Sequence, residues 1–188
     1  MTDTETADAE PGDGTLCTGV VTIASNRSLE SDDSGEAIVT ALEDSGNEVT
    51  VREHVGADHD RVQSIVSRLI DRDDVDVVIT AGATGVEPTD VTIEAVEPLL
   101  EKELATFSEL FTVLAYERIG TEAITARTIA GIAEGSVVFS LPGDADAVRL
   151  ALEEIVVPEA LAIVERAGVA ESDADDGEAE GDGADGGA

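Results

Sequence analysis

The stretch VVITAGATGVEPTD, residues 77–90, decides the fold that we expect for this chain. It begins with four apolar or β-branched residues, which are typical of a strand buried on both faces of a sheet. A turn of small residues follows at positions 81–85, and the stretch ends on Asp90 after a proline. A buried strand that leaves through glycines is typical of a parallel sheet that binds ligands beyond the carboxyl ends of its strands.

Apolar strands alternate with amphipathic helices on both sides of this stretch. We expect strands at residues 16–25, 47–55, 75–80 and 136–143, with the alternating 47–55 strand nearest an edge. We expect helices at residues 32–46, 57–73, 92–104, 105–120, 121–135 and 144–168, with a division near Pro98 and a bend or break before Pro158. Strands separated by helices predict an α/β fold in which helices sandwich a mostly parallel sheet.

The charge of the chain is strongly one-sided. The formal net charge is −33, and Lys102 is the single lysine among ten basic residues. The segments 1–14 and 171–188 hold five and eight acids, so thirty acids remain between them. An acidic surface with almost no lysine resembles proteins from organisms that accumulate molar salt, where self-repulsion is screened. No basic stripe exists to neutralise phosphates, which argues against a nucleic-acid partner.

The composition predicts one domain with two acidic tails. We assign residues 1–14 and 169–188 to disordered tails and residues 15–168 to the domain. The single Cys17 excludes an internal disulfide and is expected to be buried, and two histidines without a third ligand argue against zinc. No apolar run approaches about 20 residues, so we expect a cytoplasmic protein without a membrane partner.

The carboxyl ends of the predicted strands carry small and polar residues. Consecutive backbone amides in the turn at 81–85 favour phosphate oxygens, although a simple tight turn is the commoner meaning of such glycines. Asp58 and Asp90 stand near predicted helix starts, where they could cap helices or hold Mg²⁺ beside a nucleotide. Arg27, Arg127 and Arg149 are the nearby cations, and each could equally be a surface ion-pair partner.

Several motifs, taken together, are far more specific than the glycines alone. They are SNR (25–27) with DDSG (32–35), VVITAGATG (77–85) followed by PTDVTIEAVEPLLEKEL (88–104), FSELF (107–111), ERIGTEAITARTIAGI (117–132) and VVFSLPGDADAVRLALEEIVVPE (137–159). From residue 20 to about residue 164, this order of motifs resembles the MoaB/MogA family of molybdenum cofactor biosynthesis proteins.

The resemblance implies a fold, an activity and a set of site residues. It implies a three-layer α/β sandwich that assembles as a trimer or hexamer and adenylylates molybdopterin with ATP and Mg²⁺. The catalytic and magnesium-binding residues would be Asp58 and Asp90. The nucleotide would lie on the turn formed by Gly82, Ala83, Thr84 and Gly85. The pterin substrate would contact Ser25, Arg27, Arg127, Pro142, Gly143 and Asp144.

Four residues depart from the pattern usual in this family. They are Ala83 in place of a second glycine, Thr89 in place of a basic residue, Ala126 in place of a serine, and Asp144 in place of Ser or Asn. Ala83 is strained if its φ is positive, and the carboxylate of Asp144 opposes a bound phosphate. A second hypothesis is therefore a family member that binds the pterin as a carrier or assembly partner without adenylylating it. A third is a mononucleotide-binding regulator unrelated to the cofactor.

Overall fold

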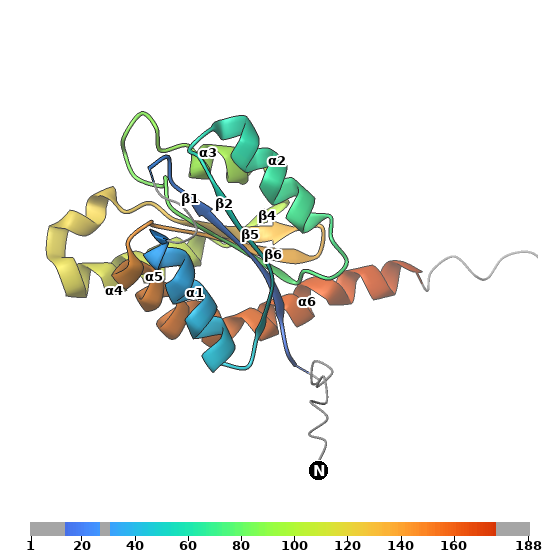
Figure 1. Ribbon diagram of the computed structural model, residues 1–188. Helices are drawn as coiled ribbons and strands as arrows, with labels where there is room; N and C mark the ends of the chain where they lie inside the picture. Colours follow the sequence, from blue (N-terminus) through green and yellow to red (C-terminus); the bar gives the residue numbers. More distant parts are fainter. Residues whose placement is uncertain (1–13, 27–30, 176–188) are drawn as a thin grey trace, which may run out of the picture.

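The computed structural model describes residues 14–26 and 31–175. In these residues, six strands form one sheet in the order β2-β1-β3-β6-β5-β4, with helices on both faces (Figure 1). The strands are β1 (Cys17–Ile23), β2 (Glu48–Val55), β3 (Val77–Ala81), β4 (Lys102–Glu103), β5 (Ile129–Ala133) and β6 (Ser136–Leu141). The expected α/β fold with a mostly parallel sheet is confirmed.

Four neighbouring strands run parallel, so their carboxyl ends lie along one edge of the sheet, which we call the rim. β1 pairs in parallel with β2 and β3, and β3 pairs in parallel with β6. Every residue of β3 and β6 is buried, as expected for central strands covered on both faces. β2 is an edge strand, as its alternating sequence predicted.

The helices form one layer on each face of the sheet. They are α1 (Asp33–Asp44), α2 (His59–Ile70), α3 (Thr92–Val96), α4 (Ala105–Ile119), α5 (Ala145–Ala151) and α6 (Val157–Asp175). α2 and α3 pack on one face, around Val66 and Val78, and the other helices pack on the opposite face, around Phe111 and Phe139. Each helix buries its apolar stripe against the sheet, and the polar stripe stays in solvent.

Two segments that we expected to be helical differ in the structure. After α3, the chain forms a 3-10 turn, η2 (Glu97–Leu99), and then strand β4, so Pro98 marks the division. The helix expected at 121–135 is wrong, because a 3-10 turn, η3 (Gly120–Thr125), leads into β5. β5 then pairs antiparallel with β6 through the two-residue loop of Glu134 and Gly135, whose φ angles are +47° and +80°. Positive φ at both loop residues is typical of tight hairpins.

The closing helix is interrupted just before Pro158, as expected. A π-helical segment, η4 (Leu152–Val156), separates α5 from α6. α6 continues to Asp175, so the backbone of residues 169–175, which we assigned to the acidic tail, is helical. Residues 1–13 and 176–188 lie outside the described residues, and their disorder stays a prediction. None of the described helices is both long and apolar enough to cross a bilayer.

Cys17 differs from expectation, because it is half-buried at the start of β1 rather than fully buried. Partial burial is the main effect that raises the pKa of its thiol, and the charges of Asp76, Glu48 and Asp74 add to it. A raised pKa disfavours the reactive thiolate at neutral pH.

Candidate functional site

The turn after β3, residues 82–85, lies at the centre of the rim, and we call it the glycine turn. The N–H of Gly82 donates a hydrogen bond to the carbonyl oxygen of Leu141 at 3.0 Å, which joins the ends of β3 and β6. Gly82 has a φ of +107°, and a Cβ at this position would lie 2.2 Å from the carbonyl oxygen of Ile23. Glycine is therefore required here for both conformation and space.

Four consecutive backbone amides, in and just after the glycine turn, have no acceptor among the described residues. Among the described residues, no hydrogen-bond acceptor faces the N–H groups of Ala83, Thr84, Gly85 and Val86. Ala83, Thr84 and Gly85 are buried or half-buried, and such backbone amides normally have a partner, whereas Val86 is exposed to solvent. Four consecutive amides without a protein acceptor therefore favour a ligand rich in oxygen atoms, such as a phosphate.

A hollow of about 360 Å³ opens beside the glycine turn, and we call it the rim hollow. Gly82 and Ala83 line one part of it, and Gly143, Asp144 and Asn26 line another. A Cβ on Gly143 would lie 3.1 Å from the Cα of Gly82, so the turns after β3 and β6 touch. The volume suits a small ligand or part of a larger one.

Asp144 gives the rim hollow its charge. Among the described residues that line the hollow, Asp144 is the single charged one. Its side chain also accepts a hydrogen bond from the N–H of Ala147 at 3.0 Å, so it caps α5. The cap satisfies one carboxylate oxygen, but the negative charge stays at the edge of the hollow. Pro142, which precedes it, is half-buried in the same turn.

Ala83 has the left-handed conformation that favours glycine, with a φ of +52°. We expected Ala83 to be strained if its φ were positive, and the positive φ confirms this. The start of α3 holds the turn in this shape from the other side. The N–H of Thr92 donates to the carbonyl oxygen of Ala83 at 2.9 Å, and the hydroxyl of Thr92 donates to that of Gly82 at 2.7 Å.

Asp90 lies against the glycine turn but does not cap a helix. Its Oδ2 accepts a hydrogen bond from the N–H of Glu87 at 2.8 Å, and a Cβ on Gly85 would lie 2.6 Å from the same oxygen. α3 begins after Val91 without a side-chain cap. The structure therefore brings Asp90 together with Gly85. Thr89, one of the four expected departures from the family pattern, is exposed.

Asp58 lies just after β2 and caps α2, which is one of the two roles that we expected for it. Its Oδ1 accepts a hydrogen bond from the N–H of Arg61 at 3.0 Å. The loop before it contacts the end of β1, because the N–H of Ala57 donates to the hydroxyl of Ser25 at 3.3 Å. Arg27, the other expected substrate contact after β1, lies outside the described residues.

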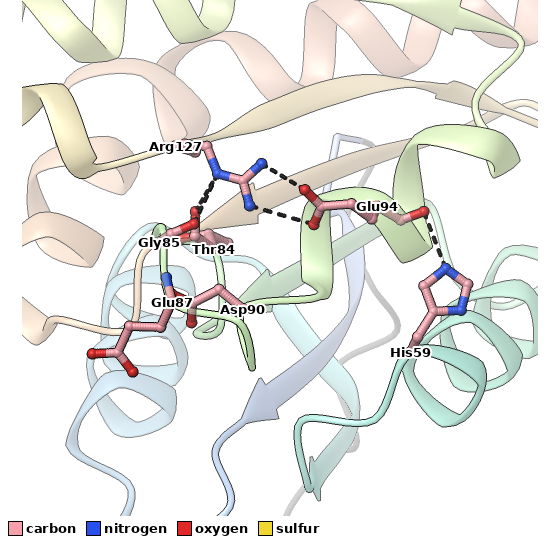
Figure 2. A network of polar contacts seen from close by, with 7 residues as sticks. All are labelled: His59, Thr84, Gly85, Glu87, Asp90, Glu94 and Arg127. Atoms are coloured by element: carbon pink, nitrogen blue, oxygen red, sulfur yellow. Dashed lines mark hydrogen bonds and ion pairs between the residues drawn. The ribbon is translucent and has the colours of Figure 1, made fainter.

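Arg127 lies just before β5, and its guanidinium contacts the glycine turn. Its Nε donates to the carbonyl oxygens of Thr84 and Gly85, at 3.1 and 2.9 Å. Its terminal nitrogens contact the two carboxylate oxygens of Glu94, at 2.7 and 3.3 Å (Figure 2). These contacts raise the pKa of Arg127 and lower that of Glu94. In this arrangement Arg127 clamps the turn, and its expected contact with the pterin stays a prediction.

Arg149 forms a surface ion pair, the simpler of its two expected roles. Its Nη1 lies 2.9 Å from a carboxylate oxygen of Asp146, three residues earlier on α5. Half of the Arg149 side chain is exposed, so such a pair contributes little to stability. Ala126, another of the four expected departures, is half-buried next to Arg127.

His59 extends the contact network to α2. Its Nδ1 lies 2.9 Å from a carboxylate oxygen of Asp60. Its Nε2 lies 3.3 Å from the backbone carbonyl oxygen of Glu94, the contact drawn in Figure 2. Both partners are acceptors, so only the doubly protonated ring can donate to both. The hydrogen bond to Asp60 is the main cause that raises the pKa of His59.

Asp32 is a buried charge at the rim that the sequence did not single out. We expected Asp33 or Ser34 to cap the helix, but Asp32 accepts from the N–H of Gly35 at 2.9 Å and is itself the cap of α1. It also accepts from the hydroxyls of Thr22 and Ser34, at 2.6 and 3.1 Å. Thr22 and Ser34 line the rim hollow, so this network supports one wall of it.

Asp58 and Asp90 stay the candidate ligands for a magnesium ion that arrives with a nucleotide. Each gives one carboxylate oxygen to a backbone amide, and among the described residues no hydrogen bond uses the other oxygen. Within the same residues, no three His, Cys, Asp or Glu side chains gather around one metal position. Mg²⁺ bound to ATP needs only one or two carboxylates, since phosphate oxygens and waters complete its shell.

Sequence comparisons relate the chain to known proteins. Residues 14–162 match a family model described as a probable molybdopterin binding domain. A molybdenum cofactor biosynthesis protein B from Bacillus cereus is 44% identical over 141 residues, which cover 74% of this chain and 83% of that protein.

Solved structures show the same fold. A crystal structure of a molybdenum cofactor biosynthesis protein B has a TM-score of 0.80 at 41% identity, over 81% of this chain and 96% of that one. The tungsten cofactor synthesizing protein MoaB from Pyrococcus furiosus has a TM-score of 0.74 at 35% identity, over 81% of this chain and 97% of that one.

Proposed function

Because the chain belongs to the MoaB family of molybdenum cofactor biosynthesis proteins, we propose that it adenylylates molybdopterin. It would transfer the AMP group of ATP to the terminal phosphate of molybdopterin and release pyrophosphate. The observation that supports this most is the run of four turn amides, Ala83 to Val86, that face no acceptor among the described residues. They lie where the carboxyl ends of parallel strands usually meet a ligand.

The proposed reaction needs no nucleophile from the protein. An oxygen of the pterin phosphate attacks the α-phosphorus of ATP, and the bond from that phosphorus to the bridging oxygen of pyrophosphate breaks. The protein holds the pterin phosphate and the α-phosphate of ATP in line, and this lowers the entropy cost of the transition state. Ser25, Pro142 and Gly143 would contact the pterin substrate, and the amides of the glycine turn would contact the phosphates of ATP.

Fixed donors stabilise the charge that develops on the departing pyrophosphate. The amides of the glycine turn are held from both sides, by Arg127 at its carbonyls and by Thr92 from α3. Such preorganised donors need no rearrangement during the reaction. Mg²⁺ held by Asp58 and Asp90 would neutralise negative charge on the phosphates.

Pyrophosphate release tests the activity. The protein is incubated with ATP, molybdopterin and Mg²⁺ in molar KCl, and pyrophosphate is measured over time. Asp90→Asn should lower the rate about 100-fold, because it removes the charge while an amide oxygen can still accept from the N–H of Glu87. Asp146→Asn, an exposed acid on α5, is the matched control and should leave the rate unchanged. Equal rates for wild type and Asp90→Asn would remove Asp90 from the site.

One observation favours the alternative, a pterin carrier without adenylylation. Asp144 is the single charged residue among the described residues that line the rim hollow, and a carboxylate there opposes the phosphates of ATP. The strained Ala83 adds to this argument. The same assay separates the two functions, because a carrier would bind molybdopterin and release no pyrophosphate.

We also propose that the chain assembles as a homotrimer or homohexamer through α4 and η3. Phe107, Phe111 and Ala115 of α4 are buried in the core. The opposite side is apolar and exposed. Its residues are Leu110, Val113, Tyr116, Ile119 and Ile124, which are 50–85% exposed. In Figure 1 the yellow segment that carries them forms the left margin of the molecule.

The oligomeric state tests this surface. Large exposed apolar patches mark interaction sites in soluble proteins, so a second copy would bury this one. Val113→Glu should shift the mass in sedimentation experiments in molar KCl from a multiple of 19.3 kDa to 19.3 kDa. Glu117→Gln, on the same helix, is the control. A monomeric wild type would contradict the proposal.

A further inference from the structure

Glu94 connects parts of the rim that are far apart in the sequence. Its carboxylate holds both terminal nitrogens of Arg127, and its backbone carbonyl oxygen lies 3.3 Å from Nε2 of His59 at the start of α2. The side chains of Glu94 and Arg127 are 51% and 37% exposed, so solvent competes with this pair. The ion pair of Glu94 and Arg127 therefore contributes little to stability by itself, and its main effect is on the orientation of the Arg127 side chain.

The Glu94 carboxylate fixes the direction of the Arg127 side chain. A guanidinium that donates two parallel bonds to one carboxylate lies in the plane of that carboxylate. In this orientation Nε faces the turn, where it donates to the carbonyl oxygens of Thr84 and Gly85. Figure 2 shows the side chain bridging Glu94 and the turn.

The carbonyl groups of the glycine turn fix the direction of the N–H groups that follow them. A trans peptide is planar, and its N–H points opposite to its C=O. Because the carbonyl oxygens of Thr84 and Gly85 point towards Arg127, the N–H groups of Gly85 and Val86 point away from it. Among the described residues these two N–H groups have no acceptor.

Arg127 also lies within electrostatic reach of Asp90. Hydrogen bonding to Glu94 is the largest cause that raises the pKa of Arg127, and the charge of Asp90 adds to it. Both side chains approach Gly85, Arg127 through Nε at 2.9 Å and Asp90 through the oxygen that a Cβ on Gly85 would meet. Glu94 supplies the guanidinium with a partner other than Asp90.

We propose that Glu94 is a positioning residue for nucleotide binding: it holds Arg127 on the glycine turn, aims the amides of Gly85 and Val86 at a phosphate, and leaves Asp90 free. This inference rests on the proposed function. It predicts that neutralising Glu94 moves the turn and weakens the binding of ATP with Mg²⁺.

Two measurements on the full-length protein in molar KCl test the proposal. Amide signals of Gly85 and Val86 are followed by NMR without ligand, and the Kd for ATP with Mg²⁺ is measured by calorimetry. Glu94→Gln should shift both signals and raise the Kd about tenfold. The matched control is Asp74→Asn. It breaks another two-pronged ion pair, that of Arg72 and Asp74, before β3 and away from the rim, and should change neither reading.

A double-mutant cycle tests whether Glu94 acts through Arg127. If it does, Glu94→Gln should have no further effect on the Kd in a protein that already carries Arg127→Ala. Equal effects with and without Arg127 would overturn the proposal, as would unchanged amide signals in Glu94→Gln. A wild type that binds no ATP would instead refute the proposed function, and the NMR measurement would still decide how Glu94 positions the turn.

Discussion

Ala83 holds a backbone conformation that disfavours a side chain. Its φ of +52° lies in the left-handed region, which costs a non-glycine residue about 1–2 kcal/mol. Ala83→Gly removes this strain but loses the contact of the methyl group with the core and adds backbone entropy to the unfolded state. We expect a net gain of about 0.5 kcal/mol in the free energy of unfolding, measured with urea. Ala81→Gly, two residues earlier in β3, should instead destabilise the fold. A lower free energy of unfolding in both variants would show that Ala83 is not strained.

Asp32 makes stability depend on pH. Burial raises its pKa, but hydrogen bonds from Thr22, Gly35 and Ser34 and the charge of Arg52 outweigh burial and leave the pKa below its usual range. Because the folded pKa is lowered, the ionised carboxylate stabilises the fold at neutral pH. This stabilisation is lost as the pH falls through the folded pKa.

Asp32→Asn should therefore lower the free energy of unfolding by about 3 kcal/mol at pH 7. The difference from wild type should begin to shrink as the pH falls below about 4, where the carboxyl of the unfolded chain becomes protonated, and should be smallest below the folded pKa. Urea unfolding of both proteins across this range gives the difference at each pH. A difference that does not change with pH would show that charge is not the cause.

Local patterns in the sequence predicted some site residues and missed others. The glycine turn and the capping role of Asp58 follow from short motifs at the end of a strand and the start of a helix. The contact of Arg127 with Glu94 joins residues 33 positions apart, and no local pattern encodes it. Asp32 was missed because four residues that could cap a helix stand in a row at 31–34, and only the packing against Thr22 decides among them.

At the scale of elements, α3 holds the glycine turn through one buried threonine. The hydroxyl of Thr92 donates to the carbonyl oxygen of Gly82, and Thr92 is completely buried. Thr92→Val leaves that carbonyl without this donor, so we expect a loss of about 1–2 kcal/mol in the free energy of unfolding.

Thr18 on β1 provides the matched control. It is also buried, but its hydroxyl has no hydrogen-bond partner among the described residues. Thr18→Val should therefore leave stability unchanged or increase it, because the substitution removes an unsatisfied polar group. Similar losses for both variants in urea unfolding would show that the hydrogen bond of Thr92 does not matter.

The elements that the sequence predicted are those with a strong internal pattern. β1, β3, β6 and α2 have continuous apolar runs or helical spacing, and the structure confirms them. β5 was predicted as helix because the stretch 121–135 that contains it has helical periodicity. A Cβ on Gly131 would lie 2.5 Å from the carbonyl oxygen of Lys102 on β4, so the glycine permits a strand pairing that only the tertiary fold reveals.

At the scale of the whole molecule, the net charge of −33 makes stability depend on salt. The Debye length falls from about 10 Å at 0.1 M to about 3 Å at 1 M, so salt screens repulsion between acids across the surface. The Tm, followed by circular dichroism, should rise as KCl increases over this range. Sucrose at matched osmolality is the control and should raise the Tm less. A Tm that is unchanged or lower in 1 M KCl would contradict repulsion as the cause.

The central claim is that ATP with Mg²⁺ binds at the rim, on the glycine turn and beside Asp58 and Asp90. A crystal structure of the protein grown with ATP and Mg²⁺ in molar KCl tests it most directly. The account predicts phosphate oxygens within hydrogen-bond distance of the amides of residues 83–86 and the metal on at least one of the two aspartates. A nucleotide bound on another surface, with the rim hollow closed to it, would contradict the account.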